Sequence, residues 1–319
     1  MANPETIMTI ETLRERQSWT LFQKIDHAVG VISQFYSQLD SNVYVSFSGG
    51  KDSTVLLDIV RRFIDPNCLA VFCNTGNEHA EIVRFVKSIE NVRTIHPKTS
   101  LKKIIEKHGF PLISKEQAQY VRQAKHTNSD KLRNIRLSGK KGRNGKYLTQ
   151  GVISKKWQYL VGAPFDVTER CCYFLKKEPF KRFHKETGLF PIIGTMAEES
   201  RLRLQKWLKQ GCNSFDSDLI ASYPLSIFTE QDIWDYIHLF NLAYCSVYDE
   251  GEKRTGCVVC GFGCQFPGDD RFYRLQRNKP LLYESVMNYN NNGITFREAL
   301  QYCNIDFPEA KNKQLRLFF

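Results

Sequence analysis

The chain has 319 residues, of which 42% are hydrophobic and 25% are charged, and 45 Lys and Arg stand against 34 Asp and Glu. This composition is typical of a globular protein with a sizeable core rather than of a disordered chain, and the length suits about two domains. Neither a signal peptide nor a run of about 18 apolar residues is present, so we expect a cytoplasmic protein without a membrane span.

Apolar residues in the first third of the chain alternate between helical and strand patterns. They predict helices over 19–38, 52–63 and 79–89 and strands over 43–47, 69–73 and 92–95; further along, they predict a strand over 189–195 and a helix over 229–240 with Thr229 as its N-cap. Such alternation predicts an α/β fold with a doubly wound parallel sheet, which binds ligands beyond the carboxyl ends of its strands.

Positive charge is concentrated between residues 115 and 156, where twelve Lys and Arg stand against two acidic residues. The Gly-rich middle of this basic segment has no helical or strand period, which predicts a mobile loop inserted between ordered elements. Two interpretations remain open: a solvated surface, or a groove at the mouth of the site for a nucleotide or nucleic acid. The nucleic-acid contacts would come from Lys140, Lys141, Arg143 and Lys146.

The stretch S-F-S-G-G-K-D-S at 46–53 lies where the first strand becomes a helix. Glycines there let backbone N–H groups approach a ligand, and the helix N-terminus attracts an anion. Ser46, Ser48, Lys51 and Ser53 crowd the same place, so we expect a phosphate site. It is not a Walker A loop, because that motif would require Gly at 45 and Ser or Thr at 52.

Four stretches, in order, resemble motifs of the phosphoadenosine phosphosulfate reductase family, within the adenine nucleotide α-hydrolase (PP-loop) superfamily. They are S-G-G-K-D-S at 48–53, F-C-N-T-G-N-E-H at 72–79, G-T-M-A-E-E-S-R-L-R at 194–203 and P-L-S-I-F-T-E-Q-D-I-W-D-Y-I at 224–237. The resemblance implies a Rossmann-like fold with a nucleotide across Ser46, Ser48, Gly49, Gly50, Lys51, Asp52, Ser53, Asn74, Thr75, Gly76, Gly194, Glu199, Ser200 and Arg203.

The cysteines form a second pattern: Cys171-Cys172, then 84 residues, then Cys257-x-x-Cys260. Two such pairs can provide four thiolates to one metal centre, either iron–sulfur or zinc, although reduced structural thiols remain an alternative. The order resembles the 4Fe-4S pattern of assimilatory adenylylsulfate reductases. Cys264 is a fifth candidate, and Cys68, Cys73, Cys212, Cys245 and Cys303 are expected to be ordinary thiols.

Two departures weaken the assignment as a sulfonucleotide reductase. Cys303, near the C-terminus, lacks the E-C-G-[LI]-H setting of the family's nucleophile, and Met196 replaces an expected Arg. We therefore expect the general superfamily chemistry: ATP, with Mg²⁺ held by Asp52 and charge neutralised by Lys51, adenylates a substrate for sulfur transfer. A reductase and a non-catalytic nucleotide-sensing module are the alternatives.

The sequence also leads to an expected organisation. We expect an N-terminal helical region (1–40), a nucleotide-binding domain (41–240) that contains the basic insertion 115–156, and a Cys-containing C-terminal region (241–319). Nucleic acid, a sulfur-donor protein and a second copy of the chain are the candidate partners.

Overall fold

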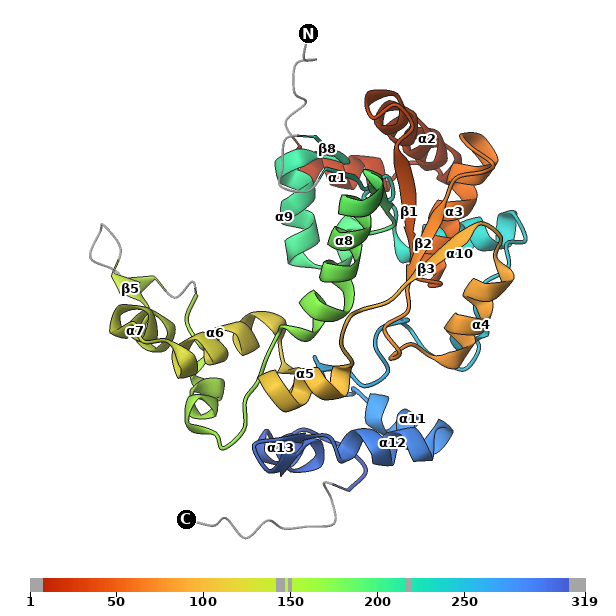
Figure 1. The fold of residues 1–319 in the computed structure, drawn as a ribbon. Coiled ribbons are helices and arrows are strands. Elements are labelled where there is room, and N and C mark those ends of the chain that lie inside the picture. Colours follow the sequence, from red (N-terminus) through yellow and green to blue (C-terminus); the bar gives the residue numbers. More distant parts are fainter. Residues whose placement is uncertain (1–7, 142–146, 149–150, 216–219, 310–319) are drawn as a thin grey trace. The chain divides into compact units, whose positions relative to one another are not determined.

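The structure is a computed structural model, which describes residues 8–141, 147–148, 151–215 and 220–309. The chain folds into two compact units (Figure 1). Unit 1 comprises Met1–Asn74, Glu78–His96 and Pro179–Gly256, and unit 2 comprises Thr75–Asn77, Pro97–Glu178 and Cys257–Phe319. Each unit has a large hydrophobic core of its own. None of the described helices is both long enough and apolar enough to cross a membrane.

Unit 1 alternates strands and helices as the sequence predicts. Its elements are α1 (Ile10–Gln17), α2 (Leu21–Gln38), β1 (Val43–Phe47), α3 (Lys51–Phe63), β2 (Ala70–Cys73), α4 (Ala80–Ser88), β3 (Val92–Ile95), α8 (Glu178–Thr187), β7 (Phe190–Ile193), η3 (Ala197–Glu199), α9 (Arg201–Gln210), β8 (Asn213–Ser214), β9 (Ala221–Ser222), α10 (Glu230–Leu239) and η4 (Ser246–Tyr248). All eight predicted elements are therefore confirmed, with ends that differ by one or two residues.

The central sheet of unit 1 has six strands in the order β3-β2-β1-β7-β9-β8. Every neighbouring pair is parallel except β8 with β9 at the edge. The chain runs outward from β1 through β2 to β3 and later returns to the other side of β1 as β7. β1 and β7 therefore flank the point at which the winding reverses, where such sheets bind ligands. The predicted Rossmann-like fold is confirmed.

Strand β1 has apolar side chains on both faces of the sheet, and both faces are covered. Val43, Val45 and Phe47 belong to the core that includes residues of α2, α3 and α10. Tyr44 points the other way and packs edge-on against Phe183 of α8, with 5.0 Å between ring centroids. Because successive side chains of a strand point to opposite faces, this continuous apolar strand is buried between two layers of helices.

Helix α10 begins with the N-cap that the sequence predicts. Thr229 Oγ1 accepts a hydrogen bond from Asp232 N–H, and Asp232 Oδ2 accepts one from Thr229 N–H at 2.7 Å. The same carboxylate forms a buried ion pair with Lys24 of α2, also at 2.7 Å. The capping box thus ties α10 to α2 as well as starting the helix.

Unit 2 consists mainly of helices around its own core. Its elements are α5 (Leu101–His108), β4 (Leu112–Ile113), α6 (Lys115–His126), α7 (Asp130–Ser138), β5 (Lys140–Lys141), β6 (Tyr147–Leu148), η1 (Lys155–Gly162), η2 (Tyr173–Lys177), β10 (Gly261–Phe262), α11 (Arg271–Asn278), α12 (Pro280–Met287), β11 (Asn290–Asn291), β12 (Ile294–Thr295) and α13 (Phe296–Tyr302). A short parallel pair, β4 with β10, joins distant parts of the chain within this unit.

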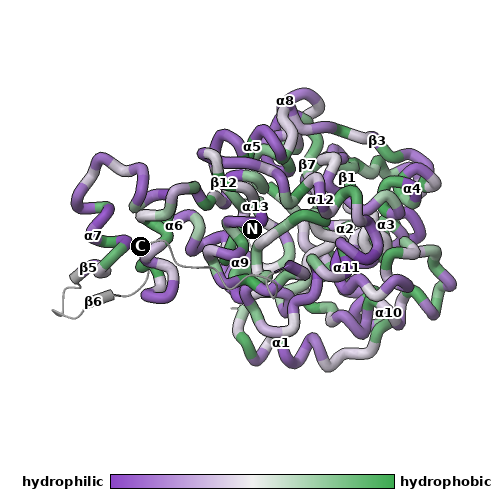
Figure 2. Tube along the Cα trace, turned by 90° about the horizontal axis from the view of Figure 1, so that it is seen from below, coloured by the Kyte–Doolittle hydropathy of each residue, from purple (hydrophilic) through white to green (hydrophobic). Residues whose placement is uncertain are grey.

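The part of the basic segment that precedes the expected loop is helical, and much of the loop itself lies outside the described residues. The helical part forms α6 and α7, and β5 pairs with β6 in antiparallel register around residues that lie outside the described part of the chain. No residue of α7 is buried, and most of this helix is hydrophilic in Figure 2. Neither helix was among the predicted elements, and α7 has no buried face that would give it an apolar stripe.

Candidate functional site

The turn between β1 and α3 needs both of its glycines, for different reasons. Gly49 has φ +72°, and a Cβ there would lie 2.8 Å from Val86 Cγ2. Gly50 has an ordinary negative φ, but a Cβ there would collide with Thr255 Oγ1 and lie 3.2 Å from Tyr248 Oη. Gly49 is thus required by backbone conformation and packing, and Gly50 by the close approach of two hydroxyl groups.

Serine hydroxyls hold the turn closed. Ser53 Oγ accepts a hydrogen bond from Ser48 N–H at 3.1 Å and donates one to Gly50 O at 2.9 Å. The N–H groups of Gly49, Asp52 and Ser53 donate to no acceptor within the described residues, and the N-cap Gly50 has no side chain to cap α3. The start of this helix therefore presents free N–H groups, which is the arrangement that binds phosphate.

Lys51 places a buried cation at this turn. Its side chain is 7% exposed, and Nζ lies 3.3 Å from Asp52 Oδ1 and 3.4 Å from Glu230 Oε1. Burial works to lower the pKa of Lys51, but the surrounding acidic groups, Asp52 first, outweigh it and raise the pKa overall. The ammonium group is therefore charged at neutral pH.

Asp52 carries the carboxylate expected to hold a metal ion. Burial raises its pKa, and Lys51 opposes this rise. Its Oδ1 is buried and receives no hydrogen bond, although it lies within ion-pair distance of Lys51. A carboxylate oxygen that lacks a donor is suited to a hard cation such as Mg²⁺.

The second nucleotide motif meets the first at the point where the winding reverses. Gly194 follows β7, and a Cβ there would lie 3.0 Å from the carbonyl oxygen of Asp52. Ser200 caps α9 by accepting from Arg203 N–H at 3.3 Å, and Glu199 forms an ion pair with the Arg203 guanidinium. Burial lowers the pKa of Arg203, while the charge of Asp52 acts to raise it. The Arg203 guanidinium therefore interacts electrostatically with the Asp52 carboxylate of the loop.

The remaining predicted nucleotide residues lie at strand ends. Ser46 is half-buried in β1, and Asn74 follows β2, the neighbouring strand, with its N–H bonded to Ile95 O at 2.9 Å. Gly76 has φ +74°, which explains the glycine at that position. Thr75 and Gly76 belong to unit 2, so their role toward an adenine stays a prediction.

Three residues at the turn were missed by the sequence analysis: Tyr248, Arg254 and Thr255. Tyr248 Oη accepts a hydrogen bond from Lys51 N–H at 2.9 Å, and the Lys51 ammonium lies 5.6 Å from the centroid of its ring. The positive charge of Arg254 acts on Arg203. Their sequence signal is weak: Arg254 and Thr255 immediately precede the C-x-x-C stretch, and Tyr248 belongs to no motif.

The four predicted metal ligands all belong to unit 2. Cys171 and Cys172 are helical residues immediately before the π-helix η2, an irregular turn that is frequent at functional sites. Cys257 and Cys260 form a turn closed by a Cys260 N–H to Cys257 O hydrogen bond of 3.0 Å. This turn leads into β10, whose pairing with β4 fixes its position in the unit.

The structure brings these four thiols near one another. The hydrogen bond to Cys172 and burial raise the pKa of Cys171, and the charges of Cys260 and Cys257 add to the rise. The same hydrogen bond lowers the pKa of Cys172, with further help from the Lys115 charge. The thiols therefore interact electrostatically, with Cys172 favoured as the thiolate and Cys171 as the protonated partner.

The four thiols are the kind of donor that a metal centre uses, but their present positions are not those of a formed site. All ten cysteines are free thiols. Within the described residues, no three Cys, His, Asp or Glu side chains stand in an arrangement that could already hold a metal ion. Four soft sulfur donors are the set that iron–sulfur clusters and structural zinc use.

The five cysteines expected to be ordinary thiols are buried. Cys303 is 3% exposed, and burial raises its pKa to about 12. A thiol in this environment is neutral and shielded at physiological pH, which makes it a poor nucleophile.

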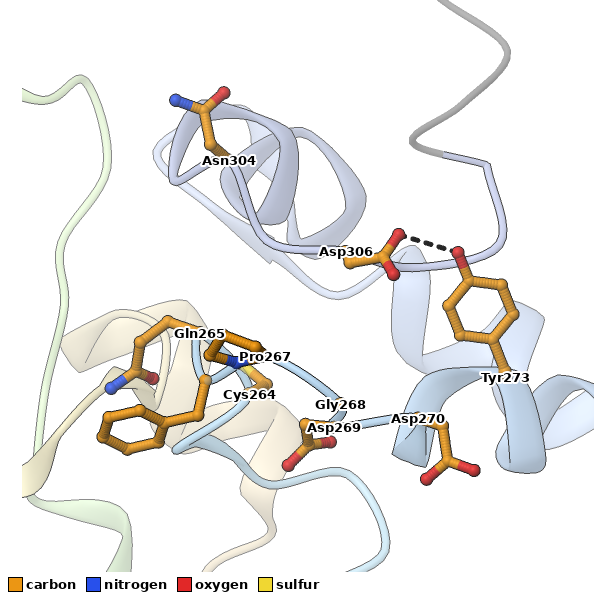
Figure 3. A pocket seen from close by; sticks show the side chains of 10 residues that line it. Cys264, Gln265, Pro267, Gly268, Asp269, Asp270, Tyr273, Asn304 and Asp306 are labelled. Carbon is orange, nitrogen blue, oxygen red and sulfur yellow. Dashed lines mark hydrogen bonds between the residues drawn. The ribbon is translucent and has the colours of Figure 1, made fainter.

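Cys264 lines a pocket of about 260 Å³ in unit 2. Its thiol donates to Gly261 O at 2.6 Å, and burial raises its pKa to about 12. The pocket's carboxylates already have partners: Asp306 accepts from Tyr273 Oη (Figure 3), and Asp269 and Asp270 form ion pairs with Arg271 and Arg274. The pocket is therefore neither an open cation site nor a thiol site.

Several cationic side chains of the basic segment form ion pairs or hydrogen bonds with other residues of unit 2. Arg122 forms an ion pair with Glu169 at 2.6 Å, Lys125 donates to two carbonyls and pairs with Asp166, and Arg136 donates to Gly151 O at 2.7 Å. Lys140 is exposed in β5. The side chain of Lys141 and all of Arg143 and Lys146 lie outside the described residues.

The family model for the phosphoadenosine phosphosulfate reductase domain matches residues 42–141 and 112–261. Protein MJ0973 of Methanocaldococcus jannaschii is 25% identical over 239 residues, which cover 73% of this chain and 45% of that protein. Adenosine 5'-phosphosulfate reductase 2 of Bacillus subtilis is 22% identical over 273 residues, which cover 84% of this chain and 92% of that enzyme.

A solved structure is also similar, that of phosphoadenylyl-sulfate reductase from Candida auris in a phosphate complex. It has a TM-score of 0.43 and 15% identity, with 78% of this chain and 96% of that chain covered. The chain spans less than half the length of two of its curated archaeal relatives. Because the family model covers well over half of its residues, the chain belongs to the phosphoadenosine phosphosulfate reductase domain family.

Proposed function

We propose that the chain is an ATP pyrophosphatase-type enzyme that adenylates an acceptor for sulfur transfer. One observation carries the proposal: the uncapped start of α3, with buried Lys51, meets the Gly194 segment where the sheet's winding reverses. Free N–H groups and an enclosed cation suit a pyrophosphate that leaves. An acceptor oxygen attacks the α-phosphorus, the α–β bond breaks, and a sulfur nucleophile then displaces AMP.

The residues of the turn have separate roles in this reaction. The N–H groups of Gly49, Asp52 and Ser53 hold the departing pyrophosphate, and Lys51 balances the charge that develops on it. Asp52, whose buried Oδ1 has only the Lys51 ammonium as a charged contact, would hold Mg²⁺, which would supply positive charge to the phosphates. Met196 stands where the family motif has an arginine, and Arg203 provides the second cation of the site instead.

Cys171, Cys172, Cys257 and Cys260 would hold a 4Fe-4S cluster, with zinc as the alternative. Such a cluster supplies electron transfer or a sulfur-binding iron when it is bound. The contribution of the chain is to gather four thiols and to place the positive charge of Lys115 near Cys172, which favours the thiolate form that binds metal.

Nucleic acid is the acceptor class that we consider first, because Lys140 is exposed in β5, which follows a helical scaffold held by internal ion pairs, and the sequence continues with further cations. Arg122, Lys125 and Arg136 are engaged in that scaffold, so fewer cations are available for a polyanion than the charge count suggests. A sulfur-donor protein is the second partner proposed, and a homo-oligomer remains compatible with both.

A sulfonucleotide reductase is the second candidate, because the chain is similar to the Bacillus subtilis reductase. Burial of Cys303 argues against it, because that chemistry needs an accessible thiolate. A nucleotide-sensing module without catalysis is the third candidate.

The three candidates separate in one set of assays on anaerobically purified protein. Pyrophosphate and AMP formed from ATP support the proposal. Sulfite released from a sulfonucleotide identifies a reductase. Tight adenine-nucleotide binding with neither product identifies a sensing module, and iron and sulfide analysis of the same sample tests the cluster.

A further inference from the structure

Tyr248 occupies an unusual position beside the loop, 197 residues along the chain from the helix that it contacts. Its hydroxyl oxygen accepts the Lys51 N–H hydrogen bond at 2.9 Å, at the first residue of α3. A phenol oxygen that accepts one hydrogen bond still has its own proton to donate. Thr255 is a second hydrogen-bond partner and acts to lower the pKa of Tyr248, which is the effect of a hydroxyl that donates to the phenol oxygen. Both bonds therefore use the oxygen as acceptor, and the proton of Tyr248 remains to be donated beside the free N–H groups of the turn.

The ring of Tyr248 is held firmly. It packs edge-on against Trp234 of α10, with 5.6 Å between ring centroids. Its centroid also lies 6.4 Å from that of the Tyr244 ring. The preceding residue, Val247, is fully buried in the core of unit 1. A side chain anchored in this way is a fixed part of the site rather than a cover that swings away.

We propose that Tyr248 is a nucleotide-binding residue, whose hydroxyl accepts from Lys51 N–H and donates its own proton to a phosphate oxygen held at the turn. This inference rests on the proposed nucleotide site. Burial raises the pKa of the Tyr248 hydroxyl, so it keeps the proton it must donate at neutral pH. The Lys51 ammonium nitrogen also lies 5.6 Å from the centroid of this fixed ring, and the cation–π interaction helps to keep Lys51 in place.

Tyr244 offers a matched control. It belongs to the same aromatic cluster, but its hydroxyl bonds to Asp249 at 2.9 Å. Tyr248→Phe and Tyr244→Phe each remove one hydroxyl and keep the ring, so packing is retained in both. Titration calorimetry with inorganic pyrophosphate and with ATP, together with the urea midpoint of each protein, separates binding from stability.

We expect Tyr248→Phe to weaken pyrophosphate and ATP binding roughly 10-fold or more, because it removes one hydrogen bond to a charged group. Tyr244→Phe should bind as the parent does. Equal affinities for Tyr248→Phe and the parent, with a lower urea midpoint, would mean that Tyr248 only caps α3. Tighter binding by Tyr248→Phe would mean that the hydroxyl competes with phosphate. A parent that binds neither ligand would contradict the proposed nucleotide site itself.

Discussion

The loop at 48–53 and the group of four thiols differ in how complete they are before any ligand binds. The loop is held closed by its own serine hydroxyls, and its buried Lys51 has two acidic neighbours. The thiols lie near one another, yet the hydrogen bond to Cys172, burial and the charges of the other thiols raise the pKa of Cys171, and the thiols are not set in coordinating positions among the described residues. The loop is thus preorganised, whereas the thiol site that we propose would form only when its metal binds.

This difference follows from the way each region is built. The loop consists of consecutive residues between one strand and one helix, so local hydrogen bonds can fix it. The thiols come from two segments 84 residues apart, and only the packing of unit 2 brings them together. Metal binding should therefore stabilise the thiol region, while nucleotide binding should change the loop little.

The largest expected effect separates the two regions. Cys257→Ser should lose nearly all bound iron and its visible absorption, because one of four thiolate ligands is removed. ATP affinity should stay within about twofold of the parent, since Lys51 and the loop are untouched. Cys303→Ser, which changes a buried thiol outside the group, is the control and should retain the metal. Iron retained by Cys257→Ser would rule out a shared centre.

The next effect concerns the loop cation. Lys51→Met keeps an apolar stem but removes the charge, and it should lower pyrophosphate formation from ATP by roughly 100-fold or more. The iron content should not change. Lys87→Met, an exposed lysine on α4, is the matched control. Steady-state pyrophosphate release measures the effect, and a loss below about threefold would remove Lys51 from the reaction.

A smaller effect tests whether the loop is preorganised. Ser53→Ala removes the acceptor for Ser48 N–H and the donor to Gly50 O. The free energy of unfolding should fall by about 1–2 kcal/mol, because buried polar groups lose their partners. Urea unfolding measures it, and ATP affinity should fall in parallel. An unchanged midpoint would show that the turn does not depend on these bonds.

The smallest effect is a pH dependence in the unit that carries the loop. Burial lowers the pKa of His27 to about 4, and the Arg16 charge adds to this. Between pH 6.5 and 4 the unfolded chain binds a proton that the folded chain does not, so stability falls as the pH falls and is unaffected above 6.5. The loss by pH 5 should be about 1–2 kcal/mol.

His27→Gln should flatten this slope, as judged by urea midpoints from pH 5 to 7. His238→Gln is the control, because His238 is an exposed histidine on α10 of the same unit. An unchanged slope in His27→Gln would assign the acid sensitivity to other groups.

The sequence was sufficient to predict eight elements of unit 1, because each has a clear apolar pattern, and Thr229 also marked the start of α10. It did not predict the other elements of the unit, which include α1, α8, α9, β8 and β9. It also indicated the loop, since Ser53 and Gly50 are neighbours in the chain. Tyr248 could not be predicted, because its contact with Lys51 depends on how η4 packs near the start of α3. The sequence interpretation attributed Gly50 to phosphate alone; the structure adds its packing against Thr255.

The cysteine group shows the same limit. Spacing led to the prediction that Cys171-Cys172 and Cys257-x-x-Cys260 share one site, which stays a prediction. The nearby charge of Lys115 depends on the packing of α6 within unit 2. In the basic segment, net charge alone suggested a free cationic surface. Partners such as Glu169 and Asp166 come from residues beyond the segment and became visible only in the structure.

The central claim is that the turn at 48–53 holds the pyrophosphate part of ATP. A crystal structure of the chain with Mg²⁺ and α,β-methylene-ATP, whose α–β linkage is not cleaved, tests this most directly. We predict β- or γ-phosphate oxygens within about 3 Å of the N–H groups of Gly49, Asp52 and Ser53. A nucleotide bound elsewhere, or a turn left empty at saturating ATP analogue, would contradict the account.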